Sequence, residues 1–311
     1  MTPAERARRT GGQVLRGLAM GSVELVPGVS SGTVALVLGI YERLVHAIST
    51  AASAAGSLLR GRPRETARHL AAFPWGWVLT LLVGIAVGVL VLAGPLERLL
   101  LDHPQALAGL FFGLIVGAVV ACRRMLRRPT AAVGFAAAFA AVVFFLVLGL
   151  QTAGGDVVED VSRPLWAFFL SGAVAVCAMI LPGVSGSFIL VLLGMYAQML
   201  GALNERNLPV IAVFLLGCAI GLASFAKVLD WLLAHHHDLV LGALIGLMLG
   251  SLRLLWPWPH GLDSPEIGAP SGTVAAPVLL AVAGFALVVL VDRLAHPGRT
   301  GRSENVRSRR R

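Results

Sequence analysis

Long apolar stretches alternate with short, arginine-rich polar stretches along the chain. Six of the apolar stretches are each about 17–20 residues long, enough as helices to cross a hydrocarbon core of roughly 30 Å. They fall near residues 75–94, 106–122, 131–150, 209–227, 239–256 and 274–292. Two others, 14–41 and 164–203, are longer and are interrupted by turn residues. The pattern predicts an all-α polytopic membrane protein.

The two interrupted stretches share one motif. Residues 27–41 and 182–196 both begin Pro-Gly-Val-Ser and both end Gly-x-Tyr, and seven of the fifteen positions are identical. The part of the first stretch that precedes Pro27, residues 14–26, makes only about 20 Å of helix, which is too short to cross. We therefore expect a re-entrant helical hairpin in each stretch, although two full crossings would give the same sidedness.

Arginines indicate which side of the membrane each loop faces, because cytoplasmic loops are enriched in them. The basic N-terminus and the arginines after the first motif should both be cytoplasmic. These arginines are Arg43, Arg60, Arg62, Arg64 and Arg68. Alternation then places 123–128 and the C-terminus inside and the acidic loop 156–160 outside. Both termini are predicted to be cytoplasmic.

Glycines also indicate that the chain is duplicated, because those of the first half align with those of the second at a constant offset of 133 residues. The aligned pairs are Gly84 with Gly217, Gly88 with Gly221, Gly109 with Gly242, Gly113 with Gly246, and Gly117 with Gly250. Glycines four residues apart allow helices to pack closely in lipid. Packing is the main role that we expect of them.

Together the repeated motif and the aligned glycines predict one membrane domain, residues 1–311, made of two repeats. Residues 14–150 form the first and 164–293 the second, each a re-entrant helical hairpin plus three transmembrane helices. An odd number of crossings per repeat makes the second an inverted repeat. Residues 294–311 are expected to be a basic, disordered cytoplasmic tail.

The motif turns are the candidate binding site. Irregular backbone at membrane depth is tolerated where protein or a watery cavity surrounds it, so the two turns should meet. Ser30 and Ser185 suit the N-cap of the following half-helix, and exposed N–H groups there favour an anion such as phosphate. A purely structural kink is the alternative. The predicted substrate-binding residues of the turns are Pro27, Gly28, Ser30, Ser31, Gly32, Thr33, Pro182, Gly183, Ser185, Gly186 and Ser187.

Three charged residues lie near the first turn. Glu24 stands three residues before it, and an ionisable group at that depth is costly unless it is paired, protonated or functional. We expect it to carry a proton or act as a gate, with a buried pair to an arginine as the alternative. Arg16 and Arg43 are candidates for binding the phosphate, or equally for anchoring at the membrane surface.

Composition excludes several other functions. Apolar residues make up 57% of the chain and charged residues 13%, and the net charge of +9 comes from arginines between spans and at the termini. This distribution fits contact with anionic lipid rather than nucleic acid. The consecutive residues His235, His236 and His237 cannot all face one metal ion on a helix. No metal or cofactor is predicted.

The paired Pro-Gly-Val-Ser turns, Glu24, and the Gly-Ile-Tyr-Glu-Arg run at 39–43 resemble the PopT family, formerly domain of unknown function 368. The resemblance covers roughly residues 12–293. It implies a flippase in the bacterial plasma membrane that moves undecaprenyl phosphate, or a similar polyprenyl phosphate, from the outer to the inner leaflet. This lipid recycling supplies peptidoglycan and related glycan synthesis, and coupling to protons or another cation is expected, with Glu24 as the proton carrier.

Two other functions stay open. Membrane undecaprenyl-pyrophosphate phosphatases carry a similar turn, but their arginine position is Ser31 or Gly186 here and the acidic pair is missing. Without a cation or metal at the reacting phosphate, catalysis is not expected. A transporter of a small soluble anion would share the predicted site. The sequence does not indicate the oligomeric state or which hairpin holds the phosphate.

Overall fold

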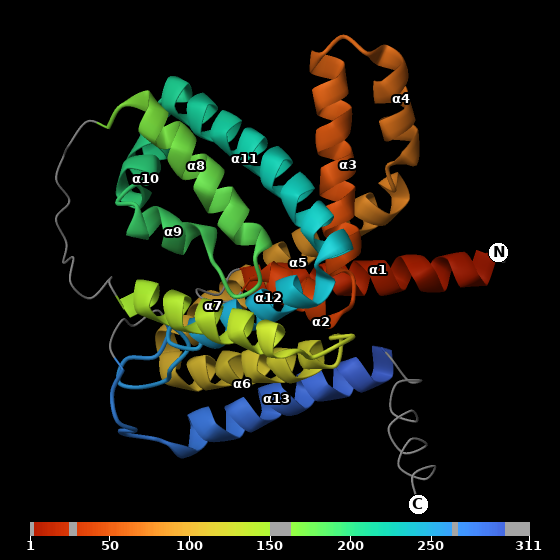
Figure 1. Ribbon diagram of the computed structural model, residues 1–311. Coiled ribbons are helices and arrows are strands. Elements are labelled where there is room, and N and C mark those ends of the chain that lie inside the picture. Colours follow the sequence, from red (N-terminus) through yellow and green to blue (C-terminus); the bar gives the residue numbers. More distant parts are fainter. Residues whose placement is uncertain (1–2, 25–29, 150–162, 263–266, 296–311) are drawn as a thin grey trace, which may run out of the picture.

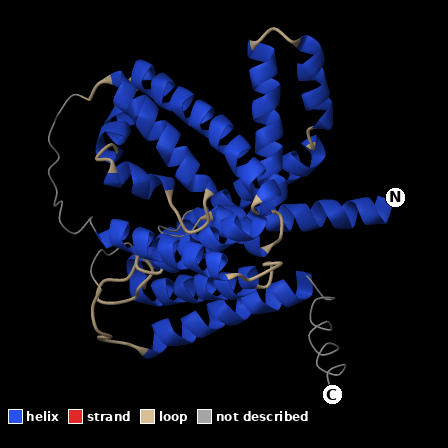
Figure 2. Cartoon of the chain, viewed as in Figure 1, coloured by secondary structure: helices blue, strands red, loops and turns tan. Residues whose placement is uncertain are grey.

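The computed structural model describes residues 3–24, 30–149, 163–262 and 267–295, which are all-helical with no strand (Figures 1 and 2). This confirms the predicted all-α class. The helices are α1 (Pro3–Glu24), α2 (Ser31–Val37), α3 (Tyr41–Leu59), α4 (Pro63–Ala72), α5 (Trp75–Asp102), α6 (Pro104–Arg123), α7 (Ala131–Gly149), α8 (Leu165–Ile180), α9 (Gly186–Leu192), α10 (Tyr196–Asn204), α11 (Leu208–His235), α12 (His237–Ser251) and α13 (Ala275–Ala295).

Five of these helices, α5, α6, α7, α11 and α13, are long and apolar enough to cross a membrane. They correspond to five of the six predicted single spans. The sixth, near 239–256, is α12, which ends at Ser251 after 15 residues and is shorter than the sequence suggested. The chain is a multi-pass membrane protein.

Each interrupted stretch breaks a second time, at a position that sequence analysis did not single out. Gly39 between α2 and α3 has φ of 66°, and Gly194 between α9 and α10 has φ of 63°. The residue after each glycine donates its N–H to a carbonyl five residues back, from Ile40 to Ala35 and from Met195 to Leu190. Only glycine adopts this left-handed helix ending without strain. It bends α9 against α10 by 108°.

Residues 60–68, whose arginines were expected to be cytoplasmic, are partly helical. Pro63 occupies the first turn of α4, where a missing N–H costs nothing, and α4 folds back against α3 (Figure 1). The second half has no counterpart between α10 and α11. The long α3 and the helix α4 therefore form a helical hairpin that the second half lacks.

Glycines allow particular pairs of helices to pack closely. At Gly17 and Gly84 an added Cβ would overlap the backbone of the facing helix, so α1 and α5 touch directly. At Gly172 and Gly217 the same holds for α8 and α11. Glycines of α6 contact α13, and glycines of α12 contact α7. The last helix of each half, α7 or α13, therefore packs against a helix of the other half. This confirms the packing role expected of the glycines, while the inverted orientation of the halves stays a prediction.

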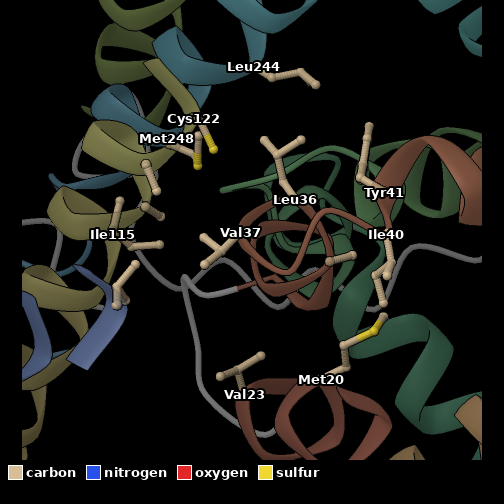
Figure 3. Close-up of a cluster of buried hydrophobic side chains, with 14 of the residues drawn as sticks. Met20, Val23, Leu36, Val37, Ile40, Tyr41, Ile115, Cys122, Leu244 and Met248 are labelled. Atoms are coloured by element: carbon tan, nitrogen blue, oxygen red, sulfur yellow. The ribbon is translucent and has the colours of Figure 1, made fainter. Parts of the chain in front are cut away.

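The largest cluster of buried apolar side chains surrounds α2 (Figure 3). Leu36 of α2 is fully buried, and Tyr41 at the start of α3 is 1% exposed. Ile115 of α6 and Met248 of α12 belong to the same cluster. A seven-residue helix is too short to be stable alone, so this packing is what holds α2 in place.

Candidate functional site

The structure brings the two motif turns into direct contact. Thr33 Oγ1 accepts a hydrogen bond of 3.0 Å from the backbone N–H of Gly183. Ser30 Oγ donates to the carbonyl of Met179 at 3.3 Å, and Tyr41 Oη donates to the carbonyl of Ile180 at 3.2 Å. Side chains of the first motif thus satisfy backbone groups at the end of α8. Pro27 and Gly28 lie outside the described residues.

The two predicted N-caps differ. Ser30 precedes α2 in an extended conformation, and its hydroxyl accepts from the N–H of Gly32 at 3.1 Å. Ser185 occupies the same place before α9 with the same backbone shape, but its hydroxyl lies 2.8 Å from the hydroxyl of Ser187 instead. Ser185 is an N-cap by position, and no side-chain cap bond is present there.

A polar cavity of about 380 Å³ opens beside the turns. Its polar walls are Glu24, Ser30, Ser185 and Ser187, which come from both motifs and from the end of α1. Apolar walls come from α8, α9 and α11, and include Met179, at the position that repeats Glu24. Four of the predicted site residues with polar side chains therefore meet in one cavity. Its size suits a phosphate-sized group with space for water.

Glu24 is exposed at this cavity. Within the described residues it forms no hydrogen bond and no ion pair. The alternative of a buried pair with an arginine is therefore wrong for the described part of the chain. A carboxylate that opens onto a cavity of a membrane protein without a partner is expected to be functional.

The two predicted arginines do not line this cavity. Arg16 is half-buried in α1, eight residues before Glu24. Arg43 is exposed on α3, and its guanidinium lies 4.5 Å from the ring centroid of Trp77, a cation–π contact. None of the described cavity walls is a basic side chain, so a phosphate-binding role of these arginines stays a prediction.

The remaining motif residues pack the turns together. Gly32 leaves no space for a Cβ, which would lie 2.8 Å from the carbonyl oxygen of Ile180. Gly183 has φ of 82° and approaches the backbone of Met248. Pro182 is fully buried, Ser31 is half-buried, and Gly186 touches the cavity. Pro182, Gly32 and Gly183 thus shape the turns, and their predicted contact with the substrate stays a prediction.

The two hairpins differ strongly in burial, although their motifs are similar in sequence. Tyr41 is 1% exposed and its repeat counterpart Tyr196 is 40% exposed. Leu36 is fully buried, whereas Val191 at the equivalent position is 46% exposed. The first hairpin is part of the core, and the second lies at the periphery beside the cavity.

The three consecutive histidines have structural contacts. His237 opens α12, with Nε2 3.0 Å from Glu42 Oε1 and Nδ1 2.9 Å from Asp238 Oδ1. Asp238 in turn accepts the backbone N–H groups of Arg127 and Arg128. In the described part of the chain, His, Cys, Asp and Glu form no cluster of three that could hold a metal ion. The group ties α3, α12 and the α6–α7 connection together.

Comparison with known proteins supports the family that the sequence resembles. A family model described as VCA0040-like, undecaprenyl phosphate translocase-like, matches residues 20–267. The polyprenyl-phosphate transporter of Vibrio cholerae is 38% identical over 256 residues, 80% of this chain and 78% of the relative. The polyprenyl-phosphate transporter of Staphylococcus aureus is 30% identical over 260 residues, 78% of this chain and 85% of the relative. No solved structure matches.

Both relatives are named as transporters, in agreement with the expectation that the chain is not an enzyme. The family match spans both motifs, Glu24 and every described wall of the polar cavity. The chain belongs to the undecaprenyl phosphate translocase-like family.

Proposed function

We propose that this protein transfers a polyprenyl phosphate, such as undecaprenyl phosphate, from the outer to the inner leaflet of a bacterial plasma membrane. One observation carries the proposal: both copies of a repeated turn contribute hydroxyl groups to one polar cavity inside a multi-pass membrane protein. The names of the two relatives supply the substrate class. The arginine distribution supports cytoplasmic termini. Inward delivery for glycan synthesis is proposed from the family resemblance.

The phosphate is proposed to bind Ser185 and Ser187. Their hydroxyls bond only to one another among the described residues, so either can turn its proton toward a ligand. Ser30 is less available, because its hydroxyl already donates to Met179 and accepts from Gly32. The second hairpin then holds the head group, and the first serves as its rigid support. The hydrocarbon chain stays in apolar surroundings throughout.

Glu24 is proposed to couple transfer to protons. A carboxylate and a phosphate in one cavity repel each other, and two unit charges 4 Å apart interact by about 4 kcal/mol at an effective dielectric constant near 20. Protonation of Glu24 removes this repulsion, so proton and phosphate bind cooperatively. A proton moving inward also offsets the cost of carrying negative charge into the cell, about 2.3 kcal/mol per charge per 100 mV.

The test uses purified protein in liposomes. Fluorescent undecaprenyl phosphate is placed in both leaflets, and its transfer is followed by chemical quenching of the outer leaflet. Protein-dependent transfer without release of phosphate from undecaprenyl pyrophosphate supports the proposal. Release of phosphate would indicate an enzyme, and uptake of inorganic phosphate without lipid transfer would indicate a soluble-anion transporter. Either result overturns the proposal.

A further inference from the structure

A second cavity, of about 210 Å³, lies between α1, α2, α6 and α13. Its walls are apolar apart from the hydroxyls of Ser22 and Thr33. Both hydroxyls are already bonded to backbone, since Ser22 Oγ donates to the carbonyl of Ala19 and Thr33 Oγ1 accepts from Gly183. Two hydroxyls that are each already bonded to backbone leave the cavity mostly apolar, so it is suited to hydrocarbon.

The apolar cavity and the polar cavity are both lined in part by the end of α1 and by the segment around the start of α2. Val23 lines the apolar cavity and the next residue, Glu24, lines the polar one. In the following segment, Ser30 at the N-cap of α2 lines the polar cavity, and Thr33, one turn later, lines the apolar one. The two cavities are thus adjacent along the end of α1 and the start of α2.

We infer that the apolar cavity binds the part of the polyprenyl chain nearest the phosphate, an inference that rests on the proposed function. A lipid with one charged end and a long hydrocarbon chain needs a polar and an apolar compartment side by side, and this is the arrangement that the two cavities provide. The outer wall is α13, where Leu287 is 53% exposed, so the chain can enter from the bilayer.

Another apolar cavity serves as an internal control for this assignment. It measures about 310 Å³ and lies between α6, α13 and the segment with Trp256 and Trp258. No helix that contributes to the polar cavity lines it. If any apolar cavity could bind the hydrocarbon chain of the substrate, this one would bind it equally well. Adjacency to the polar cavity is what distinguishes the smaller one.

Photolabelling tests the inference without relying on transfer. A prenyl phosphate carrying a diazirine on its first isoprene unit is bound to the protein in nanodiscs, irradiated, and its adducts are mapped by mass spectrometry. Adducts at Val34, Leu114 and Leu287 are expected. Adducts confined to the Trp256 cavity or to α7 would overturn the inference. Equal labelling of the same three residues by a diazirine phospholipid would also overturn it, because the cavity would then hold ordinary acyl chains.

Filling the cavity gives a second, functional readout. Ala19→Phe occupies it from α1, and Leu287→Phe does so from a half-exposed position that should tolerate a larger ring. Each is expected to slow undecaprenyl phosphate transfer about tenfold, because the added ring occupies space that the prenyl chain needs and a tenfold change corresponds to about 1.4 kcal/mol of binding. Val282→Phe, in the Trp256 cavity, is the matched control and should transfer normally. Transfer by wild type with equal rates in all variants would refute this inference alone, whereas no wild-type transfer would refute the proposed function.

Discussion

Thr33 and Gly183, 150 residues apart, are joined by a buried hydrogen bond of 3.0 Å. The donor is the second residue of one Pro-Gly-Val-Ser copy, and the acceptor is in the half-helix that follows the other copy. The bond links two segments that each interrupt a membrane helix. It makes the polar cavity a product of both halves of the chain, since neither motif encloses it alone.

Thr33→Val should therefore destabilise the protein. Valine keeps the shape of threonine but leaves the Gly183 N–H without its acceptor in a buried place, which costs about 1–3 kcal/mol. We expect a lower midpoint of unfolding in detergent, monitored by intrinsic fluorescence. Thr80→Val is the control, because Thr80 is half-buried and its hydroxyl bonds only within its own helix. Equal midpoints for the two variants would show that the Thr33 bond contributes nothing.

The glycine contacts predict that a Gly→Ala substitution destabilises the protein at one site and is neutral or stabilising at another. Gly84→Ala pushes a methyl group into the backbone of α1, and an overpacked contact costs roughly 1–3 kcal/mol. Gly134→Ala on α7 meets open space, so it should be neutral or stabilise the helix by up to about 1 kcal/mol. Thermal unfolding of both variants checks this. Similar destabilisation by both would argue against direct backbone contact between α1 and α5.

The proposed proton coupling at Glu24 predicts that the transfer rate depends on pH. A proton on Glu24 favours phosphate binding, so wild-type transfer should fall as the pH rises, and an acidic outside should accelerate inward transfer. Glu24→Gln is permanently neutral and carries no proton, so we expect it to lose the response to a pH gradient. Glu205→Gln, at the exposed end of α10, is the control. A Glu24→Gln variant that still responds to the gradient would exclude this carboxylate as the proton carrier.

The sequence predicted the helical class, five spans and the helix-pairing glycines, because these depend on local pattern. Apolar length identifies a span, and glycines four residues apart identify a close contact. Glu24, Ser30, Ser185 and Ser187 were likewise identified, since polar residues beside a helix break in an apolar stretch are few. The break at Gly39 was missed, although the repeated Gly-x-Tyr ending in both motifs was a usable signal.

Other features depend on tertiary contacts that no local pattern contains. The contact between the guanidinium of Arg43 and the ring of Trp77 joins two different helices, and no local pattern indicates it. Ser185 matches Ser30 in sequence, yet Ser187 competes for its hydroxyl, and the first copy has Gly32 at that place. The unequal burial of Tyr41 and Tyr196 arises because α3 packs on α11 while α10 remains at the edge.

The most direct test of the central claim is leaflet transfer by Ser187→Ala beside Ser53→Ala, in the liposome assay with fluorescent undecaprenyl phosphate. Ser53 is half-buried on α3, bonds only to its own helix and lies outside the polar cavity. Loss of a hydrogen bond to a charged group should slow Ser187→Ala roughly 10- to 100-fold, with Ser53→Ala at the wild-type rate. Equal rates in wild type and both variants would contradict the assignment of this cavity to the phosphate.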